Sequence, residues 1–190
     1  MTSIKVTKRE GHTEDLDLEK LHKVVFWATQ GITGVSASEV EIKSHIQFYN
    51  GIKTADIQET LIKSAADLIS EETPNYQYVA GKQRLSMLRK DVYGSYDVPS
   101  LREIVQRNVT VGLYTPDLLT WYSDDDWRRM DEIIDHEKDL NYSYAAIEQM
   151  IEKYLVRNRA TKEIYETPQV RYAIAAATAF HNEPKETRLK

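Results

Sequence analysis

The N-terminal stretch constrains the fold most strongly, because its hydrophobic pattern changes from that of a strand to that of a helix. Ile4 and Val6 alternate with polar neighbours, and Gly11 follows as a turn signal. From Asp17 to Trp27 the apolar residues recur instead at the spacing of one helix face. The stretch therefore predicts a small β-hairpin that leads into a helix. The apolar face of that helix comprises Leu18, Leu21, Val25 and Ala28.

Two adjacent cations, Lys8 and Arg9, lie on the predicted hairpin. Neighbouring positions of a strand point to opposite faces, so one cation could lie over a pocket formed with the helix while the other reaches around its rim. This arrangement suits a ligand that carries phosphate. The alternative is a solvated pair on an edge strand, where charges commonly prevent pairing with other chains.

Helical spacing continues beyond this stretch, with turn signals between the segments. Asp17 suits the N-cap of the first helix and Gly31 its end, while Ser36 and Glu39 have the spacing of a capping box. Four helices under a hairpin predict one compact domain over residues 1–94. The approximate ranges of these helices are 17–31, 36–49, 54–74 and 75–94.

Residues 95–100 are the best candidate for a linker, because proline and serine interrupt the periodicity there. Residues 101–190 predict a second, mainly helical segment. Ser123 and the acidic run Asp124–Asp126 predict a capped helix start, where carboxylates favour the positive end of the dipole; a metal or phosphate-repelling role for the run is the alternative. Thr167 suits the N-cap of the last long helix. Other helices are predicted near 101–105, 114–117 and 142–155, with a hairpin at 156–165.

Composition narrows the class of protein. The 190 residues allow one or two domains, and 41% hydrophobic with 29% charged residues is typical of a soluble globular chain. A net charge of −5 without a basic stripe argues against nonspecific nucleic-acid binding. No apolar run approaches the roughly 20 residues that span a bilayer, and the N-terminus lacks the apolar core of a signal peptide. We therefore expect a cytoplasmic protein that binds neither nucleic acid nor membrane.

Metal and thiol chemistry find little support in the sequence. There are no cysteines, so disulfides, thiolate metal sites and thiol catalysis are excluded within these residues. The five histidines have no paired spacing, and the one tempting cluster is Asp135, His136, Glu137 and Asp139. Consecutive helical residues face different directions, so one site could use at most two of these side chains. We expect no metal site.

An ordered series of short motifs carries a family resemblance. The run V-x-K-R-x-G-x-x-E from Val6 to Glu14, then Leu21-His22-Lys23 and Gly51-Ile52-Lys53-Thr54, resembles the ATP-cone domain that opens the large subunit of class I ribonucleotide reductases. Later motifs resemble the segment that joins the cone to the catalytic barrel, so the resemblance covers nearly the whole chain. These motifs are Asp135–Asp139, Ser143–Ala146, Lys153–Leu155, Glu166–Gln169 and Glu186–Leu189.

The resemblance implies a site for ATP or dATP as an allosteric effector, with Mg²⁺ expected beside it. Carried onto matching positions, Lys8 and Arg9 would meet phosphate and base, and Glu14 and Asp17 the ribose hydroxyl. Lys20 and Lys23 would contact the phosphates. Thr54 would donate to the ligand, and Lys90 would close the phosphate site. Converging cations that form charge-assisted hydrogen bonds agree with a polyphosphate ligand.

Several positions depart from the family's pattern. Asp17 stands where an asparagine is usual, Gln58 where a histidine is found, and Ser86 where relatives carry a large aromatic. Gly81-Lys82-Gln83 replaces a stretch that resembles Ala-Arg-Leu. Loss of an aromatic wall removes stacking on the order of 1 kcal/mol, enough to alter the choice between ATP and dATP.

The resemblance predicts the N-terminal part of a ribonucleoside-diphosphate reductase large subunit. We expect none of the catalytic residues in this chain, because the family's radical chemistry uses cysteines. The expected partners are a separate catalytic chain, a radical-generating small subunit and further copies of the assembled large subunit. The catalytic chain would join along the apolar helix and the end of the chain, residues 170–189. The alternatives are a stand-alone nucleotide-sensing module and a scaffold whose cone no longer binds nucleotide.

Overall fold

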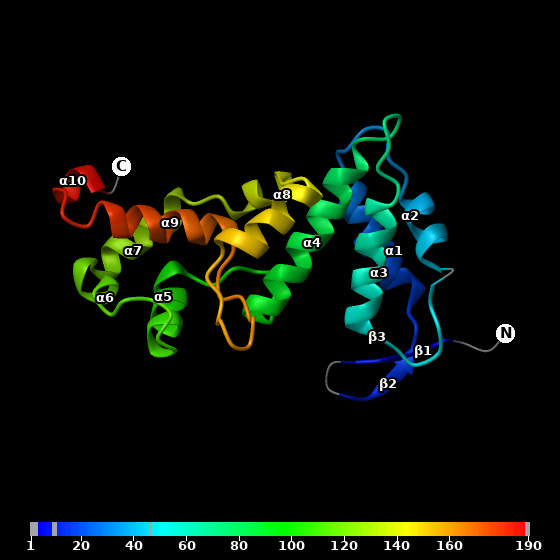
Figure 1. Ribbon diagram of the computed structural model, residues 1–190, viewed down its shortest axis with the longest axis horizontal. Coiled ribbons are helices and arrows are strands. Elements are labelled where there is room, and N and C mark those ends of the chain that lie inside the picture. Colours follow the sequence, from blue (N-terminus) through cyan, green and yellow to red (C-terminus); the bar gives the residue numbers. More distant parts are fainter. Residues whose placement is uncertain (1–3, 9–10, 46, 189–190) are drawn as a thin grey trace. The chain divides into compact units, whose positions relative to one another are not determined.

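A computed structural model describes residues 4–8, 11–45 and 47–188 (Figure 1). By its backbone contacts the chain forms two compact units. Unit 1 contains the residues up to Met87 together with Leu140–Ile147, and unit 2 contains Leu88–Asp139 and the residues from Glu148 onward. The chain therefore passes between the units after Met87, Asp139 and Ile147. The predicted domain limits at residues 94 and 101 stay predictions.

Unit 1 begins with the predicted hairpin, whose strands are β1 (Lys5–Thr7) and β2 (Thr13–Asp15). A third strand, β3 (Ile52–Lys53), was not predicted; it pairs in parallel with the other edge of β1. Two residues are too few for a periodic pattern, so the sequence gives no strand signal here. The turn that delivers β3 has Gly51 at φ +90°, and its N–H donates to the Lys5 carbonyl at 2.7 Å. Figure 1 shows this sheet at one end of the unit's helices.

The helices of unit 1 confirm the mainly helical fold class. The third ends at Ala66, earlier than predicted, because side chains close a turn before Pro74. In that turn Ser70 Oγ accepts from the Thr73 N–H at 3.1 Å, and Thr73 Oγ1 donates to the Leu68 carbonyl at 2.7 Å. The helices are α1 (Leu18–Thr29), α2 (Ala37–His45), α3 (Thr54–Ala66) and the part of α4 (Tyr76–Tyr93) up to Met87.

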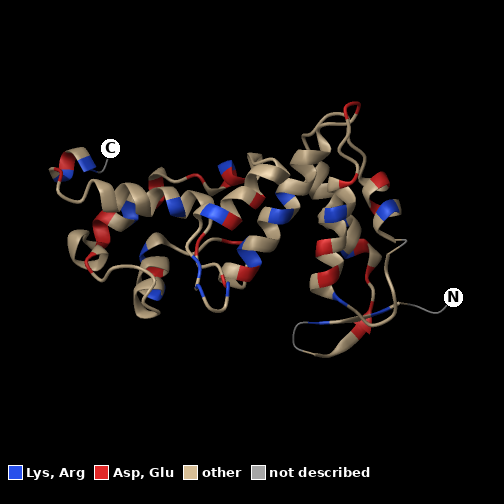
Figure 2. Ribbon diagram, viewed as in Figure 1, with Lys and Arg blue, Asp and Glu red and all other residues tan. Residues whose placement is uncertain are grey.

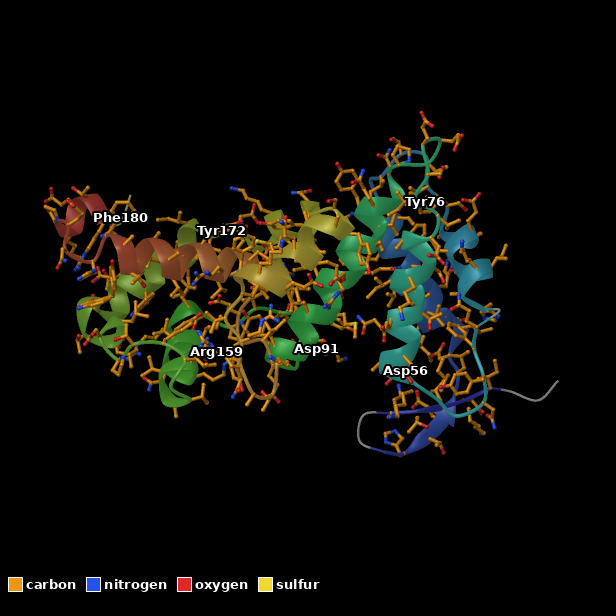
Figure 3. All side chains as sticks on the ribbon, in the orientation of Figure 1. Asp56, Tyr76, Asp91, Arg159, Tyr172 and Phe180 are labelled. Atoms are coloured by element: carbon orange, nitrogen blue, oxygen red, sulfur yellow. The ribbon has the colours of Figure 1, made fainter. Side chains whose placement is uncertain are left out.

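A buried tyrosine ties the start of α4 to the start of α2. Tyr76 is 1% exposed, and its hydroxyl accepts from the Ser36 N–H at 2.9 Å while it donates to the Glu39 carboxylate. Burial raises the pKa of Tyr76, so the hydroxyl stays protonated and able to donate. Figure 3 marks Tyr76 on α4. This bond satisfies a backbone N–H next to the core of the unit, where an unmet donor would be costly.

Unit 2 consists mainly of short helices, and the bounds of several of them differ from those expected from the sequence. Capping boxes begin α5 at Ser100 and α7 at Ser123, so the capped acidic start predicted for α7 is confirmed. The predicted hairpin is present as one bridge between Arg157 and Ile164. The elements after α4 are α5 (Leu101–Thr110), α6 (Leu118–Trp121), α7 (Asp124–Ile133), η1 (His136–Asn141), α8 (Tyr144–Gln149), the π-helix η2 (Met150–Tyr154), α9 (Pro168–Ala179) and α10 (Lys185–Arg188). Of these, the end of η1 and the part of α8 up to Ile147 belong to unit 1.

Helix α9 receives its cap from a distant residue. Thr167 occupies the N-cap position, as predicted, but its side chain makes no capping bond and instead meets the Tyr93 hydroxyl at 3.2 Å. The fully buried Asp139 accepts from the Gln169 N–H at 3.3 Å, so a carboxylate lies at the positive end of the α9 dipole. Burial outweighs the nearby Arg89 and raises the pKa of Asp139 to about 6.

Among residues 4–8, 11–45 and 47–188, no helix combines the length and the apolar character that a bilayer crossing requires. The longest of these helices, α4, carries charged residues along its second half.

Substitution of Tyr76 by phenylalanine should lower the free energy of unfolding by about 1–2 kcal/mol, because the Ser36 N–H loses its acceptor. Urea unfolding followed by circular dichroism measures this change. Tyr78→Phe is the matched control: Tyr78 lies on the same helix but is 38% exposed, and we expect a change within about 0.5 kcal/mol. Equal changes in the two variants would show that the Tyr76 hydroxyl contributes nothing specific.

Substitution of Asp139 by asparagine should change how stability depends on pH. The folded-state pKa of about 6 lies above the unfolded value of about 3.9, so folding favours the protonated acid. That contribution is fully present below pH ~3.9 and is lost as pH rises through about 6. Relative to the variant, the wild type should therefore lose on the order of 2 kcal/mol between pH 4 and 7.

Urea unfolding followed by tryptophan fluorescence at a series of pH values measures this difference. Asp135→Asn, in an exposed side chain close by in sequence, serves as the control. A constant difference between wild type and Asp139→Asn across the series would rule out the assignment.

Candidate functional site

The hairpin presents Lys8 on the side that carries the buried Val6. Side chains alternate along a strand, so Lys8 and Val6 share one face and Lys5 and Thr7 the other. Glu14 is the cross-strand partner of Val6, which places it on the same face. The Lys8 Nζ lies 2.8 Å from Glu14 Oε1, and both side chains are partly buried. This face of the hairpin therefore offers a paired cation and carboxylate.

Asp17 and Lys20 lie where the hairpin runs into α1. Asp17 is the N-cap, as predicted: its Oδ1 accepts from the N–H groups of Glu19 at 3.0 Å and Lys20 at 3.1 Å. The backbone bond from Lys20 is the main cause of a lowered pKa for Asp17. Its second oxygen, Oδ2, lies 3.5 Å from Lys20 Nζ. One carboxylate oxygen is thus committed to the helix cap, and the other faces a cation.

Strand β3 brings the start of α3 beside the end of β1. Lys53 pairs with Thr7, so Thr54 and Lys8 are the next residues along the two chains. Thr54 is the first residue of α3, and Lys53 at the N-cap makes no side-chain capping bond. The first N–H groups of this 13-residue helix carry partial positive charge and suit an anion. The family resemblance led us to expect Thr54 at the same site as Lys8, but strand β3, which places the two residues side by side, was not predicted.

Three residues of α1 share a side of the helix that is turned away from its buried stripe. Lys20 and Lys23 are three residues apart and Trp27 follows four residues later, which is the spacing of neighbours on a helix surface. Lys23 is exposed, and Trp27 is 38% exposed. The helix therefore adds a cationic and aromatic surface next to the Asp17 and Lys20 pair.

The charges at this junction nearly compensate one another. The pKa of Glu14 is lowered chiefly by its bond to Lys8, with smaller contributions from Lys8, Lys20 and His12 as charges. Figure 2 shows acidic residues on β2 beside basic residues on β1 and just after it. Two lysines thus face two carboxylates, Glu14 and Asp17. An anionic ligand would have to compete with these carboxylates for the lysines.

Two further predicted site residues are Arg9 and Lys90. Arg9 lies outside the described residues, and Lys90 belongs to unit 2, where its Nζ lies 4.9 Å from the centre of the Tyr96 ring. The roles of both stay predictions. Gln58 on α3 and Ser86 on α4, the positions that depart from the family pattern, have half-buried side chains.

The part of the chain that the structure describes contains no group of three or more histidine, cysteine, aspartate or glutamate side chains placed to hold a metal ion. In the cluster that drew attention in the sequence, Glu137 meets Arg89 at 3.3 Å and Asp139 meets the Gln169 N–H. These two carboxylates therefore have structural partners.

Comparison with known proteins identifies the first part of the chain and its wider relatives. The family model for the ATP cone domain matches residues 4–91. Ribonucleoside-diphosphate reductase 1 subunit alpha of Escherichia coli is 50% identical over 185 residues, which cover 97% of this chain and 24% of that protein. The subunit alpha of Haemophilus influenzae is 49% identical, and that of Enterobacteria phage T4 is 39% identical. The chain thus spans about a quarter of the length of these relatives.

Proposed function

We propose, from the premise that this chain belongs to the ribonucleoside-diphosphate reductase alpha-subunit family, that it senses ATP and dATP for such an enzyme. The ATP cone at residues 4–91 would bind the nucleotide and set the activity of the complete large subunit. That activity is the reduction of ribonucleoside diphosphates to deoxyribonucleoside diphosphates, in the cytoplasm. The 190 residues hold no cysteine, so cysteine-based radical chemistry would use residues elsewhere in the enzyme.

The observation that carries this proposal is the meeting of Lys8, Lys20 and the N-terminus of α3 at one end of unit 1. Lysine ammonium groups and helix N–H groups both bind phosphate oxygens, and three such sources match a polyphosphate. Glu14 and Asp17 Oδ2, the Asp17 oxygen that the helix cap does not use, are acceptors for a ribose hydroxyl. In this proposal Lys23, Arg9 and Lys90 complete the contacts to phosphates and base.

The charge balance of the site supports binding of the magnesium complex rather than the bare nucleotide. Glu14 and Asp17 already offset Lys8 and Lys20, so a free triphosphate would bring excess negative charge. Mg²⁺ is held by phosphate oxygens with few protein ligands, and it reduces that excess. We therefore infer that Mg²⁺ enters with the nucleotide and is bound mainly by it.

The proposed partners are the remaining three quarters of the large subunit, a small subunit and further copies of the large subunit. Helix α9 offers a surface for the first of these. Its Val170 and Ile174 are buried within unit 2, whereas Tyr172 and Phe180 are about half exposed (Figure 3). Exposed alanines between them would let another helix approach closely. The remainder of the subunit could lie on the same polypeptide or on a second one.

Substitution of Lys8 by alanine should weaken ATP and dATP binding roughly ten- to hundredfold, the usual effect of losing a bond to a charged group. Isothermal titration calorimetry with Mg²⁺ present measures both affinities. Lys5→Ala is the matched control, because Lys5 lies on the opposite face and pairs with Asp15 at 2.7 Å. Its effect should stay within about twofold, as for an exposed ion pair.

Equal effects of the two lysine substitutions would contradict the site assignment. No heat with the wild type at millimolar nucleotide would contradict nucleotide sensing itself and favour a scaffold.

Capture of the chain from its own cells, followed by mass spectrometry, tests the proposed partner surface. We expect sequence that resembles the rest of a reductase large subunit, and its loss or destabilisation in Ala176→Glu, a charge on the exposed side of α9. Ala160→Glu, at an exposed turn, is the control. Recovery of the 190 residues alone, as a soluble monomer, would instead favour a free nucleotide-sensing module.

A further inference from the structure

A segment from the second half of the sequence is built into unit 1. Residues Leu140–Ile147, here called the strap, group with the residues up to Met87 rather than with their neighbours in sequence. The side chain of Tyr144 packs against the apolar core of the unit. The strap lies outside residues 4–91, to which the ATP cone model matches. The folded cone of this chain therefore includes residues from well beyond the matched region.

The strap crosses α4 at Gly81 with backbone against backbone. Gly81 is buried, and a Cβ atom placed there would lie 2.1 Å from the carbonyl oxygen of Tyr142 and 3.1 Å from the carbonyl carbon of Ser143. Real Cβ atoms do not approach other atoms so closely, so only glycine allows the crossing. The Ser143 carbonyl then accepts from the Ile147 N–H at 3.0 Å and begins α8. The position of the strap is thus set by the contact of Tyr142 and Ser143 with Gly81, here called its seat on α4, and the strap ends in the first turn of α8.

The residues just before the strap are fixed within unit 2. Arg89, in the last part of α4, donates to the His136 carbonyl and lies 3.3 Å from Glu137. Asp139, the last residue before the strap, accepts from the Gln169 N–H of α9. Arg89 is only 8% exposed, and Asp139 is fully buried. The segment between α7 and the strap is therefore held in unit 2 by specific contacts of His136, Glu137 and Asp139.

We propose that the strap is a positioning element that transmits the nucleotide state of the cone to unit 2. The proposal rests on the function proposed above. Helix α4 carries the strap's seat at Gly81, and the next residue, Lys82, donates to the Gln30 carbonyl at the end of α1 at 3.0 Å. The first turn of α1 carries the proposed phosphate ligand Lys20. A ligand that favours one position of α1 therefore also favours one position of α4 and of the strap. Asp139, which is anchored in unit 2, comes immediately before the strap. A shift of the strap therefore reaches unit 2 along the chain.

Hydrogen exchange measured by mass spectrometry on the whole chain tests the proposal. In the wild type, Mg-ATP should slow exchange in residues 136–147. Gly81→Ala should displace the strap and raise exchange over Leu140–Ile147 about ten- to hundredfold, as expected for overpacking of a close contact. The same variant should bind Mg-ATP within about threefold of the wild type by calorimetry, yet show no nucleotide-dependent change in residues 136–139.

Two further variants keep the test decisive. Tyr144→Ala removes the strap's packing without adding an atom to α4, and it should give the same result if Gly81→Ala does not fold. Tyr154→Ala, in an exposed side chain beyond the strap, should leave exchange and its response to nucleotide unchanged. The proposal is overturned if Gly81→Ala and Tyr144→Ala keep the wild-type response, or if bound Mg-ATP leaves residues 136–147 of the wild type unchanged. Absence of Mg-ATP binding to the wild type would overturn the proposed function and the transmission proposal, while exchange in the free variants would still show whether Gly81 seats the strap.

Discussion

The pairing of β1 on both of its edges is the constraint on which the candidate site depends. Its antiparallel partner β2 leads into α1, and its parallel partner β3 leads into α3. One three-residue strand therefore fixes the positions of the N-termini of two helices. Without β3, Thr54 and the first N–H groups of α3 would have no fixed relation to Lys8. The buried pair of Val6 and Ile52 holds this arrangement by apolar packing, because a ladder this short has few hydrogen bonds.

The same junction explains why fold and ligand place different demands on one residue. Aspartate and asparagine are about equally good N-caps, so α1 would begin equally well with either at position 17. For the proposed polyphosphate ligand the two residues differ, because aspartate, unlike asparagine, adds a negative charge beside it. Asp17 therefore satisfies helix formation fully while it makes the neighbouring lysines less available. This compromise is the reason for the proposal that Mg²⁺ enters the site with the nucleotide.

Local signals in the sequence were enough to predict most of the helices. The capping residues Asp17 and Ser123 and the apolar stripe of α1 predicted helix starts that the structure confirms, because caps and stripes act within a few residues. The features that were missed depend on contacts between distant residues. Strand β3 exists only because β1 is beside it, and Asp139 caps a helix that begins about thirty residues later. The family resemblance led us to expect Lys8, Glu14, Asp17, Lys20 and Thr54 at one site. The sheet register was needed to see that the first N–H groups of α3 lie beside Lys8.

Gly81 shows why a departure from a family pattern can be uninterpretable until its neighbours are known. A glycine inside a helix is less favourable than alanine by about 1 kcal/mol, so helix formation alone favours the alanine that the resemblance leads one to expect. The carbonyl of Tyr142 occupies the space that the alanine methyl group would need. The chain thus gives up helix stability in α4 in return for close contact with a segment about sixty residues away. Since Tyr142 has no local relation to Gly81, no periodic pattern or propensity could reveal that exchange.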